Sequence, residues 1–222
     1  MATERLRYYY FPIIDNGIGL CRSAWAMSWI VSVVGGALND THVNIENISY
    51  PYPDGAMNIA TAHFLKSEAE AMVIIDTDVM FQPKDFKLLL DHIDKKTIVA
   101  GIVPLKKTGL FFPIRTLDGE GIPEGVDLYK VAGVSRGFML IHRRVFEDMA
   151  ELLDLEDYVD PFTQEVHLLY WKPLPGGHSE DFYFCNQWRD CDGDVLVDTR
   201  IKLRHVGSAI YPIEGTFDIA TK

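Results

Sequence analysis

Two aspartates one residue apart, Asp76 and Asp78, follow the most apolar short run of the chain, Ala71 to Ile75. Such a run of aliphatic and β-branched residues is typical of a strand that is buried on both faces. Charged groups at the carboxyl end of such a strand lie where open α/β sheets bind ligands. Two carboxylates this close repel each other unless a divalent cation or a polyhydroxyl ligand shares them. The alternative is that they only start the turn into the helix that Pro83 opens.

A second acidic pair, Glu180 and Asp181, follows Ser179, which is a good N-cap for a helix predicted to run to about Asp192. Free backbone amides and the helix dipole favour ionised carboxylates in a first turn. An ionised carboxylate can accept a proton, so this pair predicts a general base. Simple complementation of the helix dipole is the alternative.

A histidine, His205, ends a predicted strand that starts at Ile201, and Val206 and Gly207 follow it. Neutral imidazole is a good ligand for transition metals. His205 could therefore complete a site with Asp78, and a hydrogen-bonded, partly buried histidine is the alternative.

The elements that must position these residues alternate between strand and helix in the first half of the chain. Strands are predicted near 7–14, 42–49, 71–76 and 97–103, and helices near 20–36, 55–70 (capped by Asp54) and 83–94. This alternation is typical of βαβ units that build a mainly parallel sheet.

The second half changes character, so the sheet is expected to become mixed there. It has a Gly/Pro-rich loop over 109–125, strands at 126–132 and 138–142, a helix from about 144, and a strand pair at 194–198 and 201–205. An irregular region over 155–178 carries Tyr158, Phe162, Tyr170 and Trp171. Loops this long usually bind ligands or act as lids. These aromatic rings would suit stacking on sugars, and packing against the core is the alternative.

The composition fits one globular domain, with 222 residues of which 48% are hydrophobic. A formal net charge of −11 disfavours nucleic acid or an anionic membrane as partner and suits a bound divalent cation. The cysteines, Cys21, Cys185 and Cys191, form no CxxC pair, which indicates reduced thiols in the cytoplasm and neither disulfides nor zinc. The longest uncharged stretch, 23–39, is short for a membrane span, and the N-terminus has no signal-peptide pattern.

In this order, the motifs resemble those of GT-A-fold glycosyltransferases, of the small family-2-like type that viruses, phages and bacteria encode. The resemblance covers roughly residues 7–211 and rests on Val73–Asp78, Ser135–Ile141, Glu180–Cys185, Val197–Asp198 and Lys202–Gly207. It implies an α/β, GT-A-like nucleotide-diphospho-sugar transferase fold with a mixed, mainly parallel central sheet flanked by helices. One domain would span 1–222, with a nucleotide-binding half over 1–105 and an acceptor and catalytic half over 106–222.

The resemblance also implies roles for the acidic residues and the histidine. Asp76-Thr77-Asp78 matches the DxD motif, whose last carboxylate binds the Mn²⁺ or Mg²⁺ on the donor diphosphate, while the first faces the ribose and the metal. His205 matches a further metal ligand of some members. Asp181 matches the second residue of the ED motif and would be the catalytic base, and Glu180 would orient it or the acceptor.

Other matching positions are expected to contact the nucleotide. The turn after the first strand would line the nucleobase, and the helix that leads to the third strand would add a further contact. The residues expected to contact the donor are Pro12, Ile14, Asp15, Arg22, Asn58, Asp76, Thr77 and Gly137.

The activity implied is transfer of a single sugar from a nucleotide-diphosphate donor, first of all a UDP-sugar, to a glycan or another hydroxyl acceptor. Inversion follows if Asp181 is the base, although a histidine ligand is commoner among retaining relatives. The Gln-x-x-Arg-Trp signature of processive synthases is missing, which agrees with transfer of one sugar. A viral source would place the enzyme in the host cytoplasm.

Two other readings remain open. Gly133-Val-Ser135-Arg-Gly137 fits the G-x-S-x-G elbow of serine hydrolases, and Asp198 and His205 follow in the usual order. That elbow requires a helix directly after the serine, whereas 138–142 is predicted to be a strand. The chain could also be a non-catalytic domain that binds a sugar nucleotide or a glycan, as one part of a longer protein.

Overall fold

The computed structural model describes most of the chain. The described residues are 6–15, 26, 28–29, 32–33, 36, 38–39, 41–107, 112–173, 179–207 and 210–212; the side chains of Asp15 and of 210–212 are not included. The helix predicted over 20–36, together with Cys21 and Arg22, falls largely or wholly outside these residues.

A mixed sheet of eight strands forms the centre of the molecule, in the order β2-β1-β3-β8-β5-β11-β7-β6. Its strands are β1 (Arg7–Asp15), β2 (Thr41–Ser49), β3 (Ala71–Ile75), β5 (Ile98–Gly101), β6 (Ile114–Thr116), β7 (Leu128–Val134), β8 (Phe138–His142) and β11 (Val195–Asp198). β1 pairs in parallel with β2 and β3, and β5 with β11, whereas the pairs that involve β8, β7 and β6 are antiparallel. The mixed sheet predicted from the change of character in the second half is therefore confirmed.

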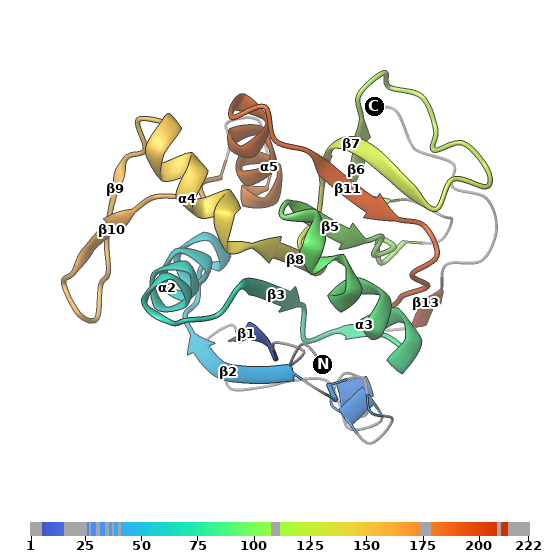
Figure 1. Cartoon of the computed structure of the whole chain (residues 1–222), viewed down its shortest axis with the longest axis horizontal. Helices are drawn as coiled ribbons and strands as arrows, with labels where there is room; N and C mark the ends of the chain where they lie inside the picture. The colour runs from blue at the N-terminus through green and yellow to red at the C-terminus, as the bar shows by residue number, and fades with distance from the viewer. Residues whose placement is uncertain are drawn as a thin grey trace, which may run out of the picture.

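Helices flank this sheet on both faces (Figure 1). They are α2 (Pro53–Lys66), α3 (Pro83–Leu90), the 3-10 helix η1 (Asp91–Lys95), α4 (Arg143–Leu152) and α5 (Glu180–Asp190). In Figure 1, α2, α4 and α5 follow one another along the left and upper side of the strands, and α3 lies at the lower right. Among the described residues, no helix is long and apolar enough to span a membrane.

The two faces of the sheet bury separate cores because side chains alternate along a strand. In β3, Met72 and Ile74 pack on the side of α2, α4 and α5, with Phe64, Phe146 and Phe184. Val73 and Ile75 face the other way and pack with Phe86 and Leu89 of α3. The strand is buried along its whole length, as its continuous apolar run predicted.

Short strands complete the fold outside the main sheet. β4 (Val79–Met80), β12 (Arg204–Val206) and β13 (Ile210–Pro212) form one small sheet, and β9 (Asp157–Val159) and β10 (Val166–Leu168) form a hairpin at the far left of Figure 1. The region over 155–178 is thus partly regular. Residues 201–203, predicted as strand, have no regular structure, and only 204–206 pair.

Helix boundaries also differ from the prediction. α2 begins at Pro53 with Tyr52 at the N-cap position, so Asp54 lies in the first turn and is not the cap. Proline fits the first turn because its missing N–H has no partner to lose there. The helix predicted over 83–94 is α3 followed by the tighter η1.

Candidate active site

The small sheet brings Asp78 and His205 together. Asp76, Thr77 and Asp78 connect β3 to β4, and β12 pairs with β4 so that His205 lies opposite Val79. The backbone N–H of Val206 donates to the carbonyl of Asp78 over 2.8 Å. As a result, Nε2 of His205 lies 3.1 Å from Oδ1 of Asp78, although the two residues are 127 positions apart in the sequence.

A second contact decides which nitrogen of the His205 ring carries hydrogen. Nδ1 lies 2.7 Å from the carbonyl oxygen of Pro104. A carbonyl oxygen only accepts, so Nδ1 must be the donor. With a proton on Nε2 as well, the ring donates to Asp78; in the neutral ring, Nε2 instead presents a lone pair to a carboxylate that also only accepts. This facing pair fits a shared cation, because metal-binding histidines usually donate their other ring nitrogen to such a carbonyl.

Lys106 provides positive charge at the same place. Its amine contacts Oδ2 of Asp78. Burial raises the pKa of Asp78, but the hydrogen bonds with His205 and Lys106 outweigh it and lower the pKa to about 2. Asp78 is therefore fully ionised at neutral pH, as a cation ligand must be.

The protein ligands for a cation are few. Among the described residues, no group of three or more His, Cys, Asp and Glu side chains could hold a metal ion. Asp76, predicted to share the cation, has Oδ1 2.7 Å from Nη1 of Arg136. Asp78 and His205 are therefore the two facing side chains that a cation could share.

Arg136 joins the two acidic pairs predicted from the sequence. It lies between β7 and β8, and only 9% of its surface is exposed. Its Nη1 donates to Asp76, while its Nε lies 3.3 Å from Oε1 of Glu180 and 3.3 Å from Oδ1 of Asp181. The predicted base and the first aspartate of the Asp76-Thr77-Asp78 triplet thus meet at one guanidinium.

Asp181 is almost completely buried at the start of α5. Burial raises its pKa, the positive charge of Arg136 lowers it, and the negative charges of Glu180 and Asp76 raise it again, so that the pKa is about 7. Although Arg136 lies close to Oδ1, this oxygen accepts no hydrogen bond of good geometry within the described residues. Oδ1 is thus a buried acceptor with Arg136 beside it and no well-aligned donor among the described residues.

Close backbone packing explains a glycine at position 137. Its carbonyl accepts from the N–H of Asp76 over 3.0 Å. A Cβ at this position would lie 3.2 Å from Oδ2 of Asp76 and 3.1 Å from Cγ2 of Val103. Gly137 therefore lies against Asp76 and lets its carboxylate approach the backbone, and the donor contact expected of Gly137 stays a prediction.

The predicted nucleotide contacts at the end of β1 can be placed only in part. Pro12 is buried and Ile14 is half-buried. β1 and β3 are parallel neighbours, so Ile14 and Asp15 end at the same edge of the sheet as Asp76. Thr77 is half-buried beside it.

Asn58 has a structural role in the protein. Its amide nitrogen donates to the carbonyls of Asp54 and Trp171, and its amide oxygen accepts from the N–H groups of Tyr170 and Trp171. An amide side chain has two donor hydrogens and two lone pairs, so all its positions are taken. Asn58 therefore has no group left for the nucleotide contact predicted for it.

The aromatic residues of the 155–178 region divide into two kinds. Tyr170 and Trp171 are buried, and the Trp171 ring stacks on Phe184 at 4.0 Å between centroids and 4° between planes. Tyr170 and Trp171 therefore pack in the core, which was the alternative to stacking on a sugar. Phe162 is 68% exposed, and its ring contacts Tyr50.

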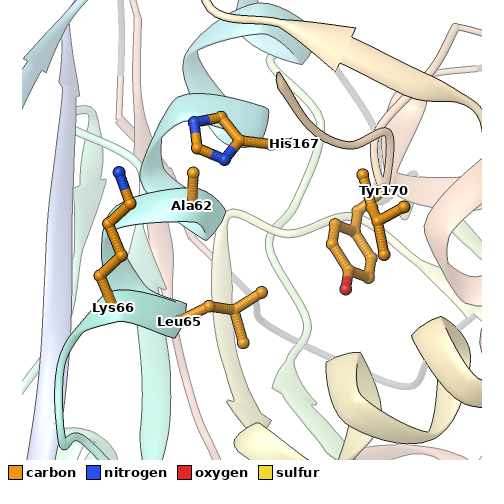
Figure 2. Close-up of a pocket in the computed structure, with 6 residues that line it drawn as sticks. Ala62, Leu65, Lys66, His167 and Tyr170 are labelled. Atoms are coloured by element: carbon orange, nitrogen blue, oxygen red, sulfur yellow. The ribbon is translucent and has the colours of Figure 1, made fainter. Parts of the chain in front are cut away.

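The hollow in Figure 2 is separate from the candidate site around Asp76, Asp78 and Asp181. It has a volume of about 210 Å³ and lies between the second half of α2 and the β10 segment, lined by Ala62, Leu65, Lys66, His167, Leu168 and Tyr170. Lys66 and His167 both pair with Glu165. None of the predicted site residues lines it.

The hydrolase arrangement is not formed. Ser135 is followed by strand β8, whereas a nucleophile elbow requires a helix there. Asp198 is hydrogen-bonded to His92 at 2.7 Å and to Arg200, and His205 is bonded to Pro104 and Asp78. Asp198 and His205 therefore have partners other than each other and Ser135.

Comparisons with known proteins find similarity in structure alone. No protein-family model matches the chain, and no curated protein matches its sequence. The crystal structure of A197 from STIV matches with a TM-score of 0.58 at 17% identity, covering 96% of each chain. UDP-glucose pyrophosphorylase complexed with UDP-glucose matches with a TM-score of 0.50 at 9% identity, covering 90% of this chain and 92% of that one. The chain has a nucleotide-diphospho-sugar transferase fold.

This fold confirms the α/β class expected from the resemblance. A structure of GalNAc-T7 with UDP, GalNAc and Mn²⁺ also matches, with a TM-score of 0.49 at 12% identity, covering 92% of this chain and 44% of that chain. At these identities the likeness describes the arrangement of strands and helices.

Two residues of the site were not predicted from the sequence. Lys106 was visible only as part of a local basic pair with Lys107, and Arg136 only as one letter of the Ser135–Ile141 phrase. Neither residue was itself assigned a role by these patterns. Their positions depend on contacts with Asp76 and Asp78, which the folded chain supplies.

Proposed function

We propose that this protein is a glycosyltransferase that moves one sugar from a nucleotide-diphosphate donor, first of all a UDP-sugar, to a hydroxyl group of an acceptor. One observation carries the proposal. Asp76 meets Glu180 and Asp181 at Arg136, and His205 meets Asp78, in a chain with a nucleotide-diphospho-sugar transferase fold.

Asp78 and His205 are the residues that would hold Mn²⁺ or Mg²⁺. The lone pair of Nε2 and the ionised carboxylate suit such an ion, and the imidazole favours Mn²⁺, since Mg²⁺ prefers oxygen ligands. When bound, the cation would act as a Lewis acid that stabilises negative charge on the leaving diphosphate. Asp76, which Arg136 holds, would then contact the ribose side of the donor.

Lys106 would support the same charge. Its amine contacts Asp78, and about a third of its side chain is exposed, so it can reach a bound phosphate. An ammonium group at the diphosphate stabilises the leaving group without giving up its proton. Lys106 is therefore the protein's own positive charge at the leaving group.

Asp181 would accept the proton of the acceptor hydroxyl. As the hydroxyl oxygen bonds to the anomeric carbon, the bond from that carbon to the diphosphate oxygen breaks, and the proton moves to the carboxylate. A base works best when its pKa lies near the working pH, and the pKa of Asp181 is about 7. Direct attack by the acceptor inverts the configuration at the anomeric carbon.

The test begins with ligand binding. Wild-type protein, Asp78→Asn and the control Asp91→Asn are melted with UDP, with and without Mn²⁺; Asp91 lies in an exposed ion pair with Lys87. We expect UDP to raise the melting temperature of wild type and of Asp91→Asn when Mn²⁺ is present and not when it is absent, because a ligand that binds the native state stabilises it. Asp78→Asn should show no such rise in either condition. Ligand at 100 times its Kd stabilises by about 2.7 kcal/mol.

Turnover is tested next, by release of UDP from UDP-sugars in the presence of candidate hydroxyl acceptors. Asp181→Asn should retain binding of UDP with Mn²⁺ and lose release of UDP to the acceptor. An equal response of Asp78→Asn and wild type to Mn²⁺ would remove the cation site from the proposal. Turnover by Asp181→Asn at the wild-type rate would exclude Asp181 as the catalytic base.

A further inference from the structure

Arg136 is a cation enclosed by carboxylates from two elements. Asp76 comes from the end of β3, and Glu180 and Asp181 come from the first turn of α5. The distances to its nitrogens are 2.7 Å for Asp76 and 3.3 Å for each of the other two. Three carboxylates thus depend on one guanidinium.

The chemistry of arginine suits this position. Its guanidinium presents donors in a rigid, planar fork, so that one group can hold several carboxylates in fixed directions. Burial lowers the pKa of Arg136, but the charges of Asp76, Asp181 and Glu180 outweigh it and raise the pKa above its ordinary value. The side chain therefore keeps its charge in spite of its burial.

The surroundings of Asp181 otherwise favour its protonated form. The carboxylates of Glu180 and Asp76 act on it and the buried thiol of Cys185 follows one turn later in α5, while the hydroxyl of Ser179 is a neutral donor to Oδ2 over 3.4 Å. Among the residues that the structure describes, Arg136 is the cation that contacts Asp181. Loss of its charge would leave the buried carboxyl group beside two negative charges, with the Ser179 hydroxyl and the first turn of α5 as its neutral stabilisers.

We propose that Arg136 is a positioning residue that holds Asp181 ionised and in a fixed place relative to Asp76, and so connects the donor side of the site to the acceptor side. This inference rests on the proposed role of Asp181 as base. Arg136 does not touch the reacting atoms and acts through the two carboxylates that it holds.

The test compares Arg136→Gln, which removes the charge, with Arg136→Lys, which keeps the charge and loses the fork. The control is Arg144→Gln, which removes an exposed ion pair with Asp148 on α4. Release of UDP from donor to acceptor is measured from pH 5 to pH 9 for each protein. We expect the midpoint of the acidic limb to rise by about 1 to 3 pH units in Arg136→Gln, since an opposite charge at this distance shifts a pKa by that amount.

A smaller rise is expected in Arg136→Lys, together with a lower plateau, because a lysine retains charge but holds the carboxylates less firmly. The control should keep the wild-type profile. A purely structural role would lower activity equally at every pH. If the midpoint of the acidic limb is the same in both Arg136 variants as in wild type, the inference is overturned.

A second measurement does not depend on turnover. Proteins labelled with ¹³C at the aspartate carboxyl are titrated by NMR, and the Asp181 signal is assigned by its loss in Asp181→Asn. We expect the titration midpoint of Asp181 to rise in Arg136→Gln and to rise by less in Arg136→Lys. If the glutamine variant does not fold, the lysine variant provides the comparison with wild type. An unchanged midpoint overturns the inference. If wild type shows no turnover, the proposed glycosyltransferase function fails, and the titration alone decides whether Arg136 controls Asp181.

Discussion

At the scale of single residues, two aspartates of the site have opposite proton affinities. The pKa of Asp78 is lowered to about 2, and that of Asp181 is raised to about 7. Both are buried in part or almost fully, so burial acts in the same direction on each. The difference comes from partners: His205 and Lys106 both face Asp78, whereas Arg136 is divided among three carboxylates. Pairs of groups with pKa values pushed apart are typical of acid and base roles in active sites.

The raised pKa of Asp181 predicts how stability depends on pH. In the unfolded chain the ordinary value is 3.8, so between about pH 4 and pH 7 the folded protein binds more protons than the unfolded one. The free energy of unfolding of wild type therefore contains a contribution that is complete below pH 4 and falls as the pH rises to about 7. Asp181→Asn lacks this contribution. We expect the variant to gain stability relative to wild type as the pH rises from 4 to 7, and no further above pH 8.

Urea unfolding at pH 4.5, 6 and 8 measures this difference, with the exposed Asp91→Asn as control. The control should differ from wild type by the same amount at all three values. A constant difference for Asp181→Asn would mean that Asp181 titrates at an ordinary pH in the folded protein.

At the scale of elements, the small sheet decides which residues face Asp78. β4 has two residues and follows the aspartate directly, and β12 pairs with it. The hydrogen bond from Val206 to the carbonyl of Asp78 lies at the end of this pairing, next to His205. The orientation of His205 thus depends on backbone pairing as well as on its own side chain.

Val206→Pro should separate the two residues without loss of the main fold. Proline lacks the N–H that bonds to Asp78, whereas Val206→Ala keeps it. We expect the proline variant to lose the stabilisation by UDP that requires Mn²⁺, and to keep the circular dichroism spectrum of wild type. The alanine variant should keep both. Equal responses of the two variants to Mn²⁺ would show that β12 does not orient His205.

At the scale of the whole molecule, long-range contacts join the predicted donor half to the acceptor half. Asn58 of α2 bonds to Trp171, 113 positions later, and Trp171 stacks on Phe184 of α5. Through these contacts, α2 and α5 bury the same core on one face of the sheet. The two halves of the sequence therefore form one structure around the candidate site.

Asn58→Ala tests this connection against the nucleotide role predicted from the sequence. The change leaves the buried N–H groups of Tyr170 and Trp171 without their acceptor, which costs about 1 to 3 kcal/mol for each unsatisfied group. Urea unfolding should show this loss of stability. Isothermal titration of the folded variant with UDP and Mn²⁺ should give the wild-type affinity, and a strong loss of affinity would return Asn58 to the nucleotide site.

The sequence by itself determined the features that lie within short segments. The buried strand β3, its carboxyl-end aspartates, the first turn of α5 and the alternation of strands and helices all follow from local periodicity and capping chemistry, which depend on neighbouring residues. These signals also led to the α/β class that the structure has.

Only the tertiary structure decided which of these residues act together. The order of strands places His205 beside Asp78 and buries Arg136 between Asp76 and Asp181, while Asn58 is turned into the core. No local pattern encodes such contacts, because they join segments up to 127 positions apart and form only when the sheet closes the intervening loops. Charge and burial at the site follow from that closure, and so do the proton affinities on which the proposed chemistry depends.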